Sequence, residues 1–252
     1  MALGTDTSPV RILGFGACMI SGFPHESGGF FEVGCRLVER ELNRRVEAKV
    51  VSLHNFPAPR AVKHLSAKLS KHRPSYVVIQ FGATDANCAV RRSNRRTAST
   101  NSATERSIPS NRYRPPNAAV RLRWEVASVA AFVRRPAPIT SEGAFIEALK
   151  HMADDCLSAS AIPIVLTPFV FGSRYSTKNA IRYAHSMAEL AKDGQIVVID
   201  CVQLLGTYPK KSTLLNDGFH LSQLAHGLIG EALAKAIIED AGQRCLLDAV
   251  AG

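Results

Sequence analysis

The chain has 252 residues, of which 46% are hydrophobic and 21% charged, so it has enough apolar residues to build a core and is not a wholly disordered chain. Its net charge is +10, but 11 arginines, no lysines and two acids give residues 91–135 a charge of +9. The remainder carries only +1, so the excess of basic residues belongs to one segment, and the protein as a whole is not one whose entire surface attracts anions.

Two further features bear on location. No stretch approaches the ~18 uninterrupted apolar residues of a membrane-spanning helix, and the first residues lack the pattern of a signal peptide. The six cysteines are scattered, with no C-x-x-C pair and no Cys/His cluster at zinc spacing. We therefore expect a cytoplasmic protein with mostly reduced, buried cysteines and no metal.

Apolar runs predict five strands, at residues 10–15, 46–53, 75–81, 162–167 and 195–200. Amphipathic spacing predicts helices at residues 30–42, 61–72, 140–159, 176–192 and 221–239. This alternation favours one α/β domain over residues 1–252: a three-layer, flavodoxin-like, five-stranded parallel sheet with helices on both faces. The arginine-, serine- and asparagine-rich stretch at about 90–117 interrupts it as a flexible insertion, followed by an extra helix at about 118–135.

Three segments lie where open parallel sheets build their sites, at the carboxyl ends of strands or next to them. They read ILGFGACMISG after the first strand, VVIQFGATDAN after the third, and DGFHLS before the final helix. In order and spacing these blocks resemble the signature blocks of the SGNH/GDSL hydrolases, and the resemblance covers most of the chain outside the insertion. It implies an α/β hydrolase that cleaves ester bonds without a cofactor. No dinucleotide fingerprint, Walker-type loop, H-E-x-x-H or G-x-S-x-G motif suggests another chemistry.

The resemblance assigns the catalytic residues, and it does so with substitutions. Cys18 stands at the position of the family's serine nucleophile, and Ala17 replaces the aspartate that usually precedes it. His220 matches the general base and Asp217 the carboxylate that orients it. A thiol can serve as nucleophile when a histidine is within reach, because the thiolate is the reactive form.

The oxyanion donors depart further from the family pattern. Thr84 replaces the family's asparagine, and the segment after the second strand, HNFPAP, has no glycine where one usually donates its N–H. The prolines of that segment have no N–H to offer. The candidate oxyanion or substrate-binding residues are then Gly16, Gly82, Thr84, Asn87 and Asn55.

We predict an esterase, acyl hydrolase or acyltransferase that uses a Cys-His-Asp arrangement on an ester or thioester, including acyl esters of sugars or other small molecules. The alternative is a weakly active or inactive member that binds an anionic ligand or partner through its arginine-rich insertion. In that case Cys18 is a packed core residue, and the Asp217–His220 pair forms without catalysis. The insertion is solvated with no ligand, or is a basic lid over the site that favours anionic substrates; nucleic-acid binding is a less favoured reading.

Overall fold

The computed structural model describes residues 8–25, 28–87, 126, 137–169, 174–192 and 195–251. Its centre is a five-stranded sheet with the order β2-β1-β3-β4-β5, in which every neighbouring pair is parallel. The strands are β1 (Val10–Gly16), β2 (Val46–Ser52), β3 (Tyr76–Gln80), β4 (Ile162–Leu166) and β5 (Val197–Ile199). The predicted five-stranded parallel sheet is confirmed, and its strand order is the flavodoxin-like one.

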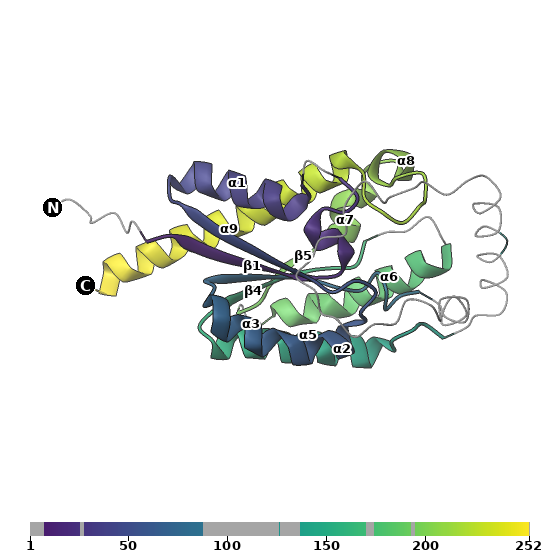
Figure 1. Ribbon diagram of the computed structural model, residues 1–252, viewed down its shortest axis with the longest axis horizontal. Helices are drawn as coiled ribbons and strands as arrows, with labels where there is room; N and C mark the ends of the chain where they lie inside the picture. The colour runs from purple at the N-terminus through teal and green to yellow at the C-terminus, as the bar shows by residue number, and fades with distance from the viewer. Residues whose placement is uncertain are drawn as a thin grey trace.

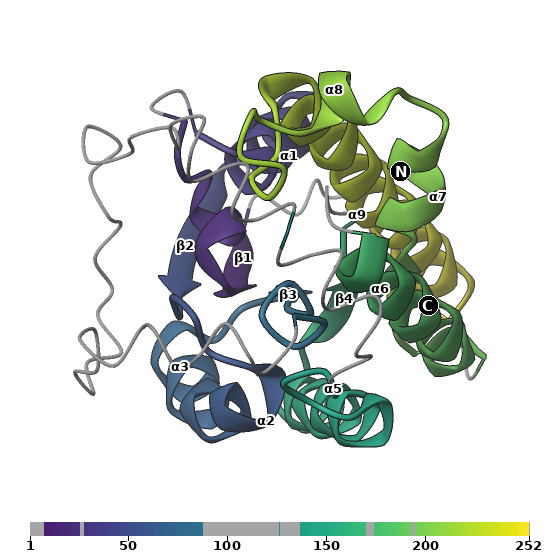
Figure 2. The ribbon, with the colours of Figure 1, turned by 90° about the vertical axis from the view of Figure 1, so that its right-hand side faces the viewer.

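Helices cover both faces of the sheet (Figures 1 and 2). One face carries α1 (Phe30–Leu42) and the long α9 (Gln223–Ala251), which pack against each other. The opposite face carries α2 (Ala58–Ala61), α3 (Leu65–His72) and α5 (Glu142–Ser158), with α6 (Arg174–Met187) beside α5. The inner strands β1, β3 and β4 are buried because both faces are covered, which explains why their sequences read as continuous apolar runs.

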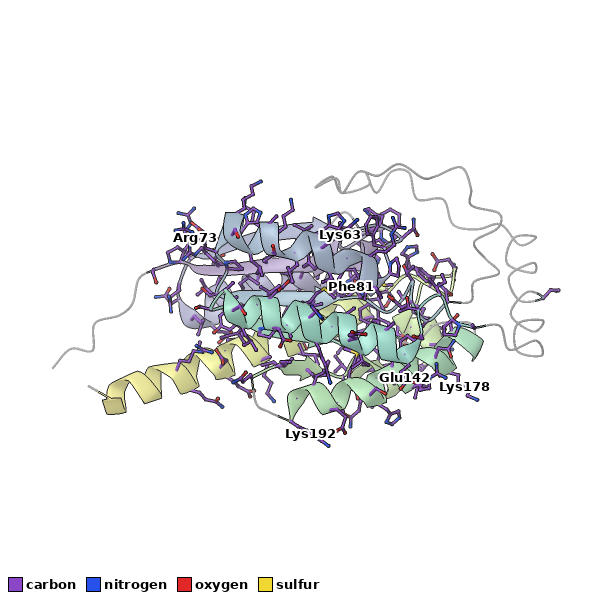
Figure 3. All side chains as sticks on the ribbon, turned by 90° about the horizontal axis from the view of Figure 1, so that it is seen from below. Lys63, Arg73, Phe81, Glu142, Lys178 and Lys192 are labelled. Carbon is purple, nitrogen blue, oxygen red and sulfur yellow. The ribbon has the colours of Figure 1, made fainter. Side chains whose placement is uncertain are left out.

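The core forms between the layers. Phe81, just after β3, is 1% exposed and packs edge-on against Phe15 of β1, with ring centroids 5.6 Å apart. In Figure 3 Phe81 lies inside, near α5, whereas Lys63 and Lys192 lie on the outside. The helices thus turn apolar side chains toward the sheet and charged side chains toward the solvent, as their periodicity predicts.

The helices differ from the prediction in three places. The helix expected at 61–72 is α2, a 3-10 turn at Val62–His64 and α3; helical structure starts earlier because proline is tolerated in a first turn, here as Pro59. Residues 201–220, between the last predicted strand and the last predicted helix, were expected to form a loop. They contain α7 (Cys201–Gly206) and α8 (Lys210–Thr213). The last helix continues beyond residue 239 to Ala251, because no proline follows to stop it.

The predicted insertion at about 90–117 and the predicted extra helix at about 118–135 lie outside the described residues, apart from position 126. Within the described ranges, no helix has both the length and the apolar character needed to cross a bilayer.

Candidate active site

The site lies at the carboxyl ends of β1, β2 and β3, where their loops meet the loop that precedes α9. The end of β1 pairs with the ends of both neighbours, Gly16 being in register with Ser52 of β2 and with Gln80 of β3. The loops that leave these three strands therefore start side by side. A Cβ at Gly16 would lie 2.5 Å from the Gln80 carbonyl oxygen, so only glycine permits this close approach.

The structure brings Asp217 and His220 together as the sequence predicts. One Asp217 oxygen, Oδ1, accepts hydrogen bonds from the backbone N–H groups of Phe219 and His220, both at 2.9 Å. The other, Oδ2, lies 2.6 Å from His220 Nδ1. The carboxylate is thus locked in place and holds one nitrogen of the ring, which leaves Nε2 for another partner.

The surroundings of His220 restrict its motion and its contact with water. Phe23 and Phe219 both pack edge-on against its ring, with centroid distances of 5.1 and 5.2 Å. Its side chain is 16% exposed and that of Asp217 is 4% exposed. A charge-assisted hydrogen bond is strong in such a place because little water competes with it.

Cys18 is that other partner. It is the first residue of a 3-10 turn, Cys18–Ser21, directly after β1, and it is partly buried. Burial raises the pKa of its thiol, but the neighbouring imidazoles of His220 and then His54 outweigh burial and lower the pKa to about 7. Burial also lowers the pKa of His220, yet Asp217 and Cys18 raise it to about 9. Between these values the pair is a thiolate facing an imidazolium.

The other described cysteines show that this behaviour is local. Cys35, Cys156 and Cys201 are reduced and buried, and burial raises the pKa of the Cys35 and Cys156 thiols to about 12 and that of Cys201 still further. They match the prediction of small, unreactive core residues. Cys18 differs because two imidazoles face it.

His54 is the site residue that the sequence reasoning missed. It lies in the loop after β2, and its Nε2 is buried with no hydrogen-bond partner of normal length in the described part of the chain. The missing glycine of this segment enters the sequence prediction, and its histidine does not. The signal that would have found His54 is its place at the carboxyl end of the strand next to β1, the same rule that selected the other blocks.

Two of the predicted donors are occupied by other partners. The N–H of Gly82 donates to Asp85 Oδ2 at 3.1 Å. Asn87 donates from Nδ2 to the Ala83 carbonyl at 3.1 Å, and its Oδ1 accepts a hydrogen bond from Ser176 at 3.0 Å. These residues shape the loop after β3.

Two further predicted donors, Thr84 and Asn55, differ in burial and in backbone conformation. Thr84 is partly buried, and its hydroxyl makes no hydrogen bond among the described residues. Asn55 is exposed and has a φ of 59°, the left-handed conformation that glycine favours. Asparagine tolerates this conformation better than most residues, which explains how the loop after β2 turns without a glycine.

Asp85 is a structural anchor of the same loop. It is fully buried and accepts hydrogen bonds from the Ala58 N–H at 2.9 Å and the Thr140 hydroxyl at 2.7 Å, besides that of Gly82. Burial raises its pKa, while these hydrogen bonds act in the opposite direction. The carboxylate joins the starts of α2 and α5 to the end of β3, and so holds the loop beside Cys18.

Across the described ranges, no three histidine, cysteine or acidic side chains form a group that could bind a metal ion. The arrangement is thus a chain of three side chains, Asp217, His220 and Cys18, with a second imidazole from His54. Chemically, it suits a thiolate nucleophile with a neighbouring acid or base.

Comparisons with known proteins concern the fold. Neither a family model nor a curated protein matches the sequence. Solved structures do match. A lipase/acylhydrolase from Enterococcus faecalis is 20% identical and aligns over 90% of this chain and 94% of its own, with a TM-score of 0.58. This protein has the SGNH/GDSL hydrolase fold.

Two more matches span nearly the whole SGNH fold. A psychrotrophic esterase from Pseudoalteromonas is 14% identical over 92% of this chain and 99% of its own, with a TM-score of 0.57. A family 3 carbohydrate esterase from Clostridium thermocellum is 11% identical over 97% of this chain and 100% of its own, with a TM-score of 0.58. The fold predicted from the three sequence blocks is confirmed.

Proposed function

We propose that this protein is an acyl hydrolase or acyltransferase that acts on an ester or thioester through Cys18, His220 and Asp217. The observation that carries the proposal is the hydrogen bond from Asp217 to His220, whose ring acts on the Cys18 thiol, at the carboxyl edge of an SGNH fold. The solved structures with this fold are described as lipases and esterases, which supports ester cleavage as the reaction class.

The first half of the reaction would be acylation. The Cys18 thiolate attacks the carbonyl carbon of the substrate and forms a C–S bond, while the carbonyl electrons move onto oxygen. The oxyanion then re-forms the carbonyl and expels the alcohol or thiol, which takes its proton from the His220 imidazolium. Asp217 keeps that imidazolium oriented and stabilises its charge. The product is an acyl thioester on Cys18.

The second half transfers the acyl group. His220, now neutral, removes a proton from water or from an acceptor hydroxyl as that oxygen attacks the thioester carbonyl. Collapse of the second tetrahedral intermediate expels the Cys18 thiolate and restores the thiolate–imidazolium pair. Water gives a hydrolase, whereas a sugar hydroxyl or other small-molecule hydroxyl gives an acyltransferase. Cys18 begins a 3-10 turn, where first-turn N–H groups lack partners within the helix, so its N–H is suited to the oxyanion, and the partly buried Thr84 in the loop after β3 is the candidate second donor.

Hydrolysis assays test this proposal. Short-chain p-nitrophenyl esters and acyl-CoA are offered to the wild type and to the variants Cys18→Ala, Cys18→Ser and His220→Ala. The exposed His151 on α5 provides a matched histidine control, His151→Ala. We expect turnover by the wild type and the control, and loss of turnover in Cys18→Ala and His220→Ala. Undiminished turnover in Cys18→Ala would exclude Cys18 as the nucleophile.

A second candidate is a protein with this fold and an idle site that binds an anionic ligand. This candidate is favoured because the Gly82 N–H and the Asn87 amide already donate hydrogen bonds within the protein. The segment that would bind the ligand, the arginine-rich insertion, is proposed from the sequence alone. Alkylation by iodoacetamide as a function of pH separates the two: a thiolate held by His220 reacts well below the unperturbed thiol pKa of ~8.5, and a merely packed thiol does not. A cytoplasmic location belongs to the proposal, since a reducing compartment keeps the Cys18 thiol and the other cysteines reduced.

A further inference from the structure

His54 is held against the turn that carries Cys18 by contacts from the two residues before it. The Leu53 N–H donates to the Gly16 carbonyl at 2.7 Å, and the Ser52 hydroxyl donates to the Ala17 carbonyl at 3.1 Å. Both bonds are buried at the end of a parallel strand pair. The loop after β2 and the nucleophile turn therefore form one unit, which brings His54 near Cys18.

The Nε2 atoms of His54 and His226 are both buried with no hydrogen-bond partner in the described part of the chain, and of these two rings it is His54 that lies near the Cys18 thiol. His220 is bound to Asp217, His25 contacts the Leu221 carbonyl at 2.8 Å through Nε2, and His226 accepts the Phe30 N–H at 3.0 Å through Nδ1. A buried polar atom without a partner costs free energy, and such atoms persist where a ligand or reacting group completes them. The unpaired atom here belongs to a ring that faces the nucleophile.

The oxyanion of the proposed reaction has two candidate donors so far, the Cys18 N–H and the Thr84 hydroxyl, and two of the predicted donors are already taken. The Gly82 N–H and the Asn87 amide are committed to Asp85 and to Ala83. The loop after β2, which in related folds would offer a glycine N–H, offers an imidazole instead. A neutral imidazole carries one N–H donor and a protonated one carries two, so a histidine can donate a hydrogen bond in either state.

We propose that His54 is a catalytic residue whose Nε2–H donates a hydrogen bond to the oxyanion of the tetrahedral intermediate. The inference rests on the proposed function. It assigns a different role to each of the two imidazoles, according to the partner that each one has. His220, bound to the Asp217 carboxylate, moves the proton. His54, which has no carboxylate partner among the residues described, gives a hydrogen bond and transfers no proton. Together with the Cys18 N–H and Thr84, His54 completes a donor set that replaces the family's glycine and asparagine.

The test compares two probes of Cys18. A short-chain alkyl trifluoromethyl ketone forms a reversible tetrahedral adduct with the thiolate and places an oxyanion in the site. Iodoacetamide alkylates the same thiolate and forms no oxyanion. Both are measured on the wild type, His54→Ala, His54→Gln and the control His151→Ala, with thermal unfolding recorded for each. The alkylation rate is taken at about pH 10, where the thiol is ionised in every variant.

We expect His54→Ala to weaken the ketone adduct about 10²–10³-fold, the usual effect of losing one oxyanion donor, while the alkylation rate stays at the wild-type value. His54→Gln, which keeps an N–H donor of similar reach, recovers part of the loss. Equal ketone affinity in His54→Ala and the wild type overturns the inference, and so does an equal fall in ketone affinity and alkylation, which would make His54 a support for the thiol or the fold.

Ketone binding requires no turnover, so the two proposals fail separately. A wild type that cleaves no ester, yet binds the ketone in a His54-dependent manner, contradicts the proposed function and keeps the oxyanion role. A wild type that cleaves esters with no dependence on His54 contradicts the inference alone. A wild type that forms no ketone adduct overturns both.

Discussion

Replacing Asp217 with asparagine keeps the shape of the site and removes its buried negative charge. Two backbone N–H groups, those of Phe219 and His220, point at one oxygen of the side chain, so the amide oxygen of asparagine takes that place. The amide NH₂ must then face His220 Nδ1, which has to accept a hydrogen bond. The ring proton moves to Nε2, and the imidazolium loses the carboxylate that stabilises it.

The size of the effect follows from the His220 pKa. Its value of about 9, against an ordinary 6.5, arises although burial acts to lower it, so Asp217 and Cys18 together supply more than the difference. That difference corresponds to about 3 kcal/mol. If asparagine removes about 2 kcal/mol of it, the thiolate–imidazolium pair and the acylation rate near pH 8 fall roughly 30-fold. The Cys18 pKa rises with the loss of its imidazolium neighbour.

The measurement is the release of p-nitrophenol in the first turnover, followed by stopped flow, together with the pH profile of iodoacetamide alkylation. The exposed Asp154 on α5 provides the control Asp154→Asn, which should match the wild type in both. Asp217→Asn with a wild-type burst rate and a wild-type alkylation profile would refute the assignment of Asp217. A slower burst with an unchanged thiol pKa would show that Asp217 acts on something other than the ion pair.

Three more outcomes are expected. The acylation rate of the wild type should rise as Cys18 loses its proton near pH 7 and fall as His220 loses its own near pH 9; a flat profile over this range would contradict the ion pair. Asp85→Ala should lower the free energy of unfolding, measured in urea, by about 3–6 kcal/mol, because it leaves three buried donors unpaired. A loss under about 1 kcal/mol, the contribution of one ordinary hydrogen bond, would contradict the role of Asp85 as an anchor. Gly16→Ala should lower both the melting temperature and Cys18 alkylation, since its Cβ meets the Gln80 carbonyl, and a wild-type melting temperature would contradict this.

Much of the fold could be predicted because its signals are long and periodic. The inner strands β1, β3 and β4 are buried on both faces, so they read as apolar runs that end at glycine or threonine. The short helices α7 and α8 carry too few residues for an amphipathic period to show, and they were expected to be loop. The end of α9 was misplaced because the stretch 242–244 is polar and exposed, which interrupts the apolar spacing of the helix.

The site was predicted less completely, for a physical reason. Asp217 and His220 are three residues apart, so one loop can bring them together, and the position of Cys18 after β1 points it to the same edge. Whether a donor is available depends on partners that are distant in sequence: Asp85 takes the Gly82 N–H, and Ser176 binds Asn87. Such competition becomes visible only when the chain is folded. His54 likewise comes near Cys18 only because the strand order places β2 next to β1.

The central claim is that Cys18 carries the acyl group, and intact-mass spectrometry tests it most directly. The protein is mixed with p-nitrophenyl acetate, quenched in acid within the first turnover, and its mass and peptide map are recorded beside those of Cys18→Ala. We predict one acetyl group on the wild type, located on Cys18, released by hydroxylamine as a thioester is, and missing from Cys18→Ala. An acetyl group on another residue, or the same adduct in both proteins, would contradict the claim.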